Sequence, residues 1–187
     1  DHITGLISLR EGQPFTIYGS DRVLATLNAN SIFNVCAPDK VPRKTLAVDK
    51  PTPLEGAGTD LGLTVEAFAV PGKIALFLEK GGADANYGSR DGDTIGLKLT
   101  SISSGKSFFY IPGCAEVDAP LAGRIRGAGL LFLDGTLFTD NEMVAQGLSQ
   151  KTGQRMGHIS MSGPDGSMEV LKPLGVKRRI YVHINNS

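Results

Sequence analysis

Single glycines separate short apolar runs along the whole sequence, and this pattern limits the fold more than any other feature. The chain of 187 residues contains 24 glycines and 10 prolines, yet 41% of its residues are hydrophobic. Glycines at this spacing are typical of many strand–loop junctions, whereas a low-complexity segment would lack the apolar residues of a core. The length suits one domain of ordinary size. We therefore predict a single globular α/β or α+β domain over residues 1–187.

Charge and cysteine content exclude several classes of protein. The 19 Lys and Arg residues balance 19 Asp and Glu residues, which argues against a general nucleic-acid binder, because the phosphate backbone requires many compensating cations. No apolar run reaches the roughly 18–20 residues of a membrane span. Two cysteines, Cys36 and Cys114, provide neither a disulfide framework nor a four-cysteine zinc site. We therefore expect a reducing, intracellular location, with no nucleic acid and no membrane as partner.

Apolar periodicity and turn residues predict paired strands first and then strands separated by helices. Prolines predict a loop or edge region with little regular structure over residues 36–62. The predicted strands cover residues 15–18, 63–70, 74–78, 94–102, 107–111, 130–133 and 178–184. The predicted helices cover residues 3–9, 22–27, 141–148 and 168–171, and a loop is predicted over 151–166.

Both ends of the sequence lie beside residues of chemical interest. The chain opens on Asp1-His2 without a methionine, and it closes on residues 181–187, within a predicted strand and its exit loop. We expect a piece of a longer protein.

Three histidines, His2, His158 and His183, all lie at junctions between elements, and Asp134 ends the apolar strand 130–133. Loops at the carboxyl ends of strands gather ligands in α/β proteins, and imidazole with carboxylate suits zinc or ferrous iron. Each residue alone has a simpler explanation, since loop histidines are usually solvated and a strand-end Asp usually caps its turn. Metal binding and these structural roles both stay open at this point.

Other chemistries have weaker support. The sequence has no G-x-S-x-G, Walker or G-x-G-x-x-G motif. Cys114 is a candidate nucleophile, although a small buried cysteine is the simpler interpretation. Basic residues follow the predicted site and are either solvated or available to a substrate rich in carboxylates. They are Lys151, Arg155, Lys177, Arg178 and Arg179.

Four long motifs together resemble the family of pyrroloquinoline quinone (PQQ) biosynthesis protein B. They are DHITGLISLREG at 1–12, LDGTLFTDNEM at 133–143, KTGQRMGH at 151–158 and YVHINN at 181–186. That family belongs to the metallo-β-lactamase superfamily. The resemblance implies an α/β fold of the αββα sandwich type, incomplete at both ends, with this chain as the middle and C-terminal part.

The resemblance also implies roles for residues. Asp1 and His2 match the end of the superfamily's H-x-H-x-D-H metal motif, and His183 matches its last metal histidine. Asp134 matches the strand-end carboxylate, which is a ligand or bridge in two-metal relatives. His158 matches a histidine that related hydrolases use for acid–base chemistry or substrate contact, so both residues are expected to be catalytic.

One departure concerns residues 68–73, where the superfamily usually has another metal histidine and this chain has none. This favours a single-metal site, with Fe2+ as the expected ion and Zn2+ as the alternative. The implied activity is hydroxylation of the tyrosine ring in the peptide-derived Glu-Tyr precursor of PQQ. Lys151, Arg155 and Arg179 would hold the carboxylates of that substrate.

The resemblance further implies a bacterial, cytoplasmic protein that works with other PQQ-pathway proteins and forms a homodimer. Two alternatives stay open. A carrier would bind PQQ or its precursor without chemistry, and a hydrolase of the same fold would use a zinc-bound hydroxide.

Overall fold

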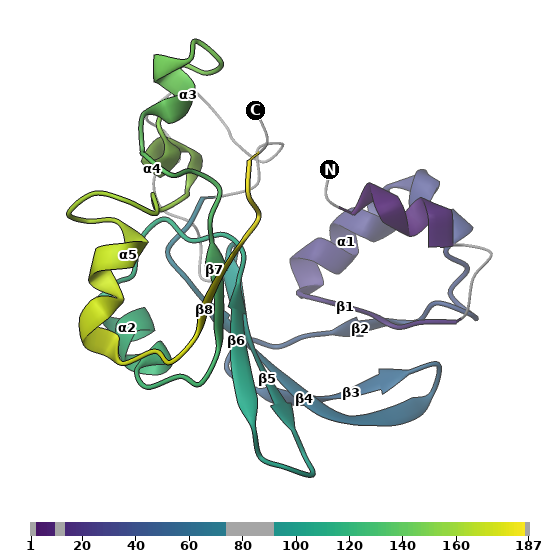
Figure 1. Cartoon of the computed structure of the whole chain (residues 1–187). Coiled ribbons are helices and arrows are strands. Elements are labelled where there is room, and N and C mark those ends of the chain that lie inside the picture. The colour runs from purple at the N-terminus through teal and green to yellow at the C-terminus, as the bar shows by residue number, and fades with distance from the viewer. Residues whose placement is uncertain (1–2, 10–13, 74–91, 186–187) are drawn as a thin grey trace. The chain divides into compact units, whose positions relative to one another are not determined.

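The computed structural model describes residues 3–9, 14–73 and 92–185. The chain forms two compact units (Figure 1): unit 1 is Asp1–Ala67 with Ser101–Gly105, and unit 2 is Phe68–Thr100 with Lys106–Ser187. In these described ranges, no helix is both long enough and apolar enough to cross a membrane. The strand predicted over 74–78 lies outside them.

Unit 1 contains a small helical core. Ser20 starts a helix as predicted, because its hydroxyl accepts a hydrogen bond from the amide of Val23 at 3.4 Å, an amide with no partner inside the helix. Leu24 and Leu27 pack against Phe33. The elements are η1 (Thr4–Leu9), β1 (Ile17–Gly19), α1 (Asp21–Ala29), η2 (Ser31–Val35), β2 (Arg43–Thr45), β3 (Pro51–Gly56) and β4 (Thr59–Ala69), with β2 parallel to β1.

The prediction of little regular structure over residues 36–62 is wrong, whereas the edge position that it allowed is confirmed for β3. That stretch contains β2, all of β3 and the start of β4. Strand β3 pairs antiparallel with β4, with Pro51 opposite Glu66 and Pro53 opposite Thr64. Since β3 is the terminal strand of its sheet, a proline that lacks an N–H leaves no partner strand unsatisfied.

Unit 2 is built around β6, β7 and β8, which pair in parallel in that order, and β5 joins β6 in an antiparallel hairpin. These strands confirm the predictions over 94–102, 107–111, 130–133 and 178–184. The elements are β5 (Ile95–Ser101), β6 (Ser107–Ile111), α2 (Ala119–Ile125), β7 (Leu131–Asp134), α3 (Glu142–Ala145), α4 (Gly153–Met156), α5 (Ser167–Val170), η4 (Lys172–Leu174) and β8 (Arg179–Val182).

The core of unit 2 lies on one face of these strands. Figure 1 shows α2 and α5 on the same side of β6, β7 and β8, and their apolar side chains meet alternate residues of β6 and β7 there. Each fully buried aliphatic side chain contributes roughly 1.5–3 kcal/mol. The members include Phe109, Ile111, Leu121, Ile125, Leu131, Leu133, Leu171 and Leu174.

Helix α2 is absent from the sequence prediction, although its start carries a recognisable signal. The Asp118 carboxylate accepts a hydrogen bond from the amide of Leu121 at 2.9 Å, and Pro120 lies in the first turn. Asp at the N-cap followed by an early proline is typical of a helix start. The helix provides the crossover that two parallel strands, β6 and β7, require.

Candidate metal centre

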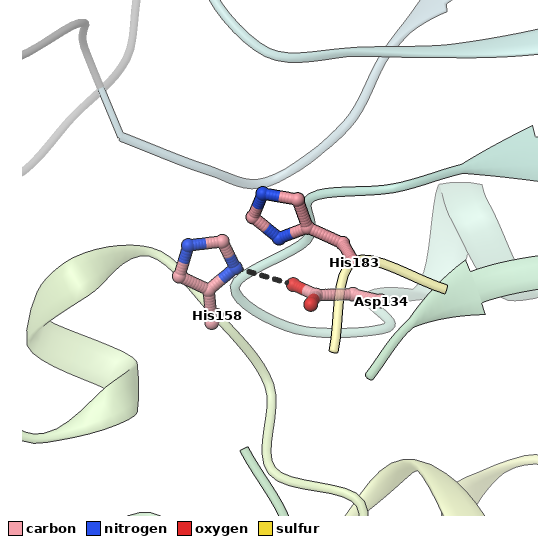
Figure 2. A group of neighbouring side chains, drawn as sticks. All are labelled: Asp134, His158 and His183. Atoms are coloured by element: carbon pink, nitrogen blue, oxygen red, sulfur yellow. Dashed lines mark hydrogen bonds and ion pairs between the residues drawn. The ribbon is translucent and has the colours of Figure 1, made fainter. Parts of the chain in front are cut away.

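Asp134, His158 and His183 meet at one end of the unit 2 sheet (Figure 2). Asp134 is the last residue of β7 and lies opposite Val182, the last residue of β8, so His183 follows beyond the same edge. His158 comes from the turn after α4. The carboxyl ends of parallel strands meet at one edge of a sheet, which explains how residues far apart in sequence gather there.

The three side chains are in direct reach of one another. The Nδ1 atom of His158 lies 2.7 Å from Oδ2 of Asp134, and the His158 and His183 rings stack at 5.4 Å between centroids with 27° between their planes. One candidate ligand atom from each residue lies within 4.8 Å of the other two. Asp134 is fully buried, His158 is partly buried, and His183 is exposed.

Four donors surround the buried carboxylate of Asp134. Its Oδ1 atom accepts from the amide of Thr136 at 3.0 Å and from the Thr136 hydroxyl at 2.6 Å. Its Oδ2 atom accepts from the amide of Cys114 at 2.9 Å and lies beside Nδ1 of His158. A buried carboxylate is costly unless hydrogen bonds satisfy it. These contacts fix Asp134 in place and orient His158.

The backbone around Gly135 leaves no room for a side chain. A Cβ atom at Gly135 would lie 2.8 Å from Cβ of Tyr181, and the Gly135 amide donates to the carbonyl of Val182 at 2.8 Å. The amide of Asn185 donates to the carbonyl of Thr136 at 3.2 Å. These contacts tie the residues after β7 to the residues after β8, and they hold both sides of the site together.

Helix α4 places His158, and it lies within the stretch predicted as a loop. Thr152 caps its start by accepting a hydrogen bond from the amide of Arg155 at 3.4 Å, and Gly157 ends it in the left-handed conformation at φ +88°. The amide of His158 then donates to the carbonyl of Gly153 at 2.9 Å. The predicted helix over 141–148 is shorter, as α3, because Gly147 also adopts a positive φ.

Replacing Gly157 by Ala is expected to lower the free energy of unfolding by about 2–4 kcal/mol. The φ of +88° disfavours any side chain, and the new Cβ would lie 2.7 Å from Cβ of Lys73, so strain and overpacking add. Gly147→Ala is the matched control, because its φ is +71° with no atom within 4 Å of the new Cβ; it should cost only about 1–2 kcal/mol. Denaturant titration measures both. Equal losses would contradict this account.

His183 itself adopts a positive φ of +61°. A non-glycine residue in this region costs of order 1–3 kcal/mol and persists only where the surrounding contacts impose it, often at functional sites. In this conformation the His183 ring stacks on the His158 ring (Figure 2).

The donor set suits a divalent transition metal. Two imidazole nitrogens and one carboxylate oxygen are the ligands that zinc and ferrous iron share. Atoms bound to one ion with bonds near 2.0–2.2 Å are separated by roughly 3–4 Å, and the separation of at most 4.8 Å between these donors is close to that range. The cluster therefore offers donors of the right kind and spacing for a metal ion, with small side-chain movements.

A pocket of about 580 Å³ adjoins the cluster and has His158 in its wall. This volume is in the usual range for small-molecule sites. Its described wall carries hydroxyl groups, an amide and three carboxylates, and no lysine or arginine is among the described residues that line it. The polar wall residues are Glu116, Thr139, Asp140, Gln154, Ser160, Ser162 and Asp165.

Cys114 is a structural residue. Its side chain is fully buried, and its thiol donates to the carbonyl of Glu116 at 2.8 Å. Burial raises the pKa of the Cys114 thiol to about 12, so the reactive thiolate is scarce at neutral pH. This confirms the simpler interpretation of Cys114. Its contribution to the site is its backbone amide, which donates to Asp134.

The other predicted site residues lie in several places. Asp1 and His2 lie outside the described residues. Lys151 precedes α4, and Arg155 lies within it, three residues before His158. Arg179 lies opposite Leu131, at the far end of the β7–β8 pair from Asp134. The substrate-binding roles of these basic residues stay predictions.

The sequence analysis does not identify Thr136, whose hydroxyl contacts all three members of the cluster. The only signal was its position two residues after Asp134, in Asp134-Gly135-Thr136. A Thr at that spacing commonly bonds a strand-end Asp as part of a turn, which gives no hint of contacts to histidines distant in sequence.

Comparison with known proteins identifies the family of the chain. Residues 1–184 match the family described as the β-lactamase superfamily domain. The chain is 48% identical to coenzyme PQQ synthesis protein B of Bradyrhizobium diazoefficiens and of Gluconacetobacter diazotrophicus, over 100% of this chain and 60% of each relative. The chain thus spans about three fifths of the length of these curated relatives.

A solved structure shows the same fold. The crystal structure of Zn2+-bound PqqB from Methylobacterium extorquens matches with a TM-score of 0.88 at 42% identity, over 100% of this chain and 59% of that one. This similarity confirms the α/β, metallo-β-lactamase-like fold predicted from the sequence motifs.

Proposed function

Because the chain belongs to the β-lactamase superfamily and resembles coenzyme PQQ synthesis protein B along its whole length, we propose that it acts in PQQ biosynthesis as a metal-dependent oxygenase. Its substrate would be the peptide-derived Glu-Tyr precursor, hydroxylated on the tyrosine ring with one atom of O2, while an external two-electron reductant reduces the other atom to water. The observation that carries the proposal is the Asp134–His158–His183 cluster, which combines metal-binding groups with an oriented histidine. We also propose that residues 1–187 form one domain.

His183 would hold the metal, with Asp1 and His2 as the expected additional ligands, and Asp134 would act beside it as a catalytic residue that orients His158. Bound Fe2+ would supply redox chemistry with O2, whereas Zn2+ would supply only Lewis-acid chemistry. The solved relative is described as Zn2+-bound, so zinc remains the alternative ion. A metal held by few protein ligands would keep coordination positions open for a substrate and a small oxidant.

His158 would move a proton during the reaction. Asp134 Oδ2 lies 2.7 Å from Nδ1 of His158, so Nδ1 carries a hydrogen and Nε2 holds the lone pair that accepts a substrate proton. His158 forms part of the pocket wall, which would bring the tyrosine ring within reach. A base oriented by a carboxylate is the usual arrangement in acid–base catalysis.

The pocket wall would select the other groups of the substrate. The carboxylates of Glu116, Asp140 and Asp165 line it and would favour a substrate ammonium group over a carboxylate. We also propose that Lys151, Arg155 and Arg179 contact the carboxylates of the substrate. These basic residues are not among the described residues that line this pocket. PQQ-pathway proteins as partners and a homodimer likewise remain proposals.

A bacterial cytoplasmic location completes the proposal. The curated relatives are bacterial proteins, and both cysteines, Cys36 and Cys114, are free and buried. Free thiols are typical of reducing compartments, which supports the expectation without testing it.

The proposed function is tested by anaerobic titration of the protein with Fe2+, followed by addition of O2, an external two-electron reductant and the Glu-Tyr precursor. We expect the product mass to rise by added oxygen on the tyrosine ring, and only when Fe2+ and O2 are both present. Turnover with Zn2+ and without O2 would instead indicate a hydrolase. Tight precursor binding that survives metal removal, with no change in mass, would indicate a carrier. Either result would contradict the oxygenase proposal.

A further inference from the structure

The hydroxyl of Thr136 lies at the centre of the Asp134–His158–His183 cluster. Its Oγ1 atom is 2.6 Å from Oδ1 of Asp134, 2.7 Å from Nδ1 of His183 and 3.1 Å from Nδ1 of His158. Thr136 is partly buried, at the end of β7 where Gly135 passes close to β8. One small side chain thus contacts every member of the cluster.

The direction of these hydrogen bonds follows from the donors available. A hydroxyl has one hydrogen and two acceptor lone pairs, and an ionised carboxylate only accepts. The 2.6 Å contact therefore requires the Thr136 hydroxyl to donate to Asp134. With its single hydrogen committed, the hydroxyl can only accept at its 2.7 Å contact with His183, so Nδ1 of His183 must carry a hydrogen.

We propose that Thr136 is a positioning residue that fixes His183 as its Nδ1–H tautomer and presents Nε2 of that ring to the metal. The proposal rests on the proposed function only in assuming that a metal binds here. Figure 2 shows the second nitrogen of the His183 ring pointing away from Asp134. Asp134 thereby orients both histidines, His158 directly and His183 through Thr136.

The surrounding backbone supports this role. The amide of Thr136 donates to Asp134 at 3.0 Å, and its carbonyl accepts from the amide of Asn185 at 3.2 Å. Both contacts fix the Thr136 backbone relative to β7 and to the residues after His183. A hydroxyl held this firmly can determine which nitrogen of a metal-binding histidine is protonated, as hydrogen-bonded partners of metal ligands commonly do.

The test compares Thr136→Val, which keeps the shape and removes the hydroxyl, with Thr136→Ser, which restores it. Long-range 1H–15N NMR spectra of the metal-free protein report the tautomer of His183, and competition with a chelator gives the affinity for Zn2+. Thr100→Val is the control, because Thr100 lies on β5 away from the cluster. We expect Thr136→Val to mix the His183 tautomers and weaken Zn2+ binding by about 10–100-fold, with Thr136→Ser and Thr100→Val near wild type.

The wild-type spectrum is decisive by itself, even if Thr136→Val fails to fold. An Nδ1–H tautomer of His183 supports the proposal, and an Nε2–H tautomer overturns it. Unchanged tautomer and Zn2+ affinity in a folded Thr136→Val protein would also overturn it. If wild type binds Zn2+ but does not hydroxylate the precursor with Fe2+ and O2, the oxygenase proposal fails, whereas the tautomer and the Zn2+ affinity still decide the role of Thr136. If wild type binds neither metal, both proposals fail.

Discussion

Replacing Asp134 by Asn is expected to lower metal affinity by at least about 100-fold and the free energy of unfolding by about 2–4 kcal/mol. The carboxylate accepts from two amides, from the Thr136 hydroxyl and from His158. Two of these donors face each carboxylate oxygen. In Asn an NH2 group replaces one of the two oxygens, so the buried donors that face it lose their acceptor. The negative charge that favours a cation is lost as well.

Asp118→Asn is the matched control for this substitution. Asp118 also accepts a backbone hydrogen bond in unit 2, from the amide of Leu121 at 2.9 Å, at the start of α2. Asn is as good a helix cap as Asp, so its stability and metal affinity should stay near wild type. Thermal unfolding and chelator competition measure both proteins. An Asp134→Asn protein as stable and as metal-binding as Asp118→Asn would refute the role given to Asp134.

Replacing His158 by Asn is expected to lower kcat by about 100- to 10,000-fold while metal binding is retained. The Asn amide can donate to Asp134 much as Nδ1 of His158 does, but it has no counterpart of Nε2 to accept a substrate proton. The buried carboxylate stays satisfied, so stability should change little. Kinetics of precursor hydroxylation and metal analysis of the same preparation measure the two effects.

His183→Ala provides the contrast, because it removes a proposed metal ligand and should abolish metal binding and turnover together. If His158→Asn loses metal as completely as His183→Ala, then His158 is a ligand and not a proton carrier. If His158→Asn keeps full activity, the acid–base role is wrong.

The strand-end positions of Asp134 and His183 were predictable from sequence, because an apolar strand that stops at a polar residue indicates which edge of a sheet that residue reaches. His158 was harder to place, since its position depends on the short helix α4 between Thr152 and Gly157. Four residues give too little periodicity to distinguish a helix from a loop.

The contacts that organise the site could not be predicted from local sequence. The hydroxyl of Thr136 reaches His183, 47 residues away, and the amide of Cys114 reaches Asp134, 20 residues away. The first contact exists because β7 pairs with β8, and the second because the residues after β6 lie beside the end of β7. The strand β3 was missed for a different reason, because Pro51 and Pro53 are compatible with a terminal strand and local propensity does not reveal where a strand lies in its sheet.

The most direct test of the central claim is the position of a bound ion. Crystals of the protein soaked in Zn2+ or, anaerobically, in Fe2+ can be examined by anomalous diffraction at the absorption edge of each metal. We expect a peak about 2.0–2.2 Å from the Nε2 atom of His183. A metal bound elsewhere in a folded protein, with no peak beside His183, would contradict the account.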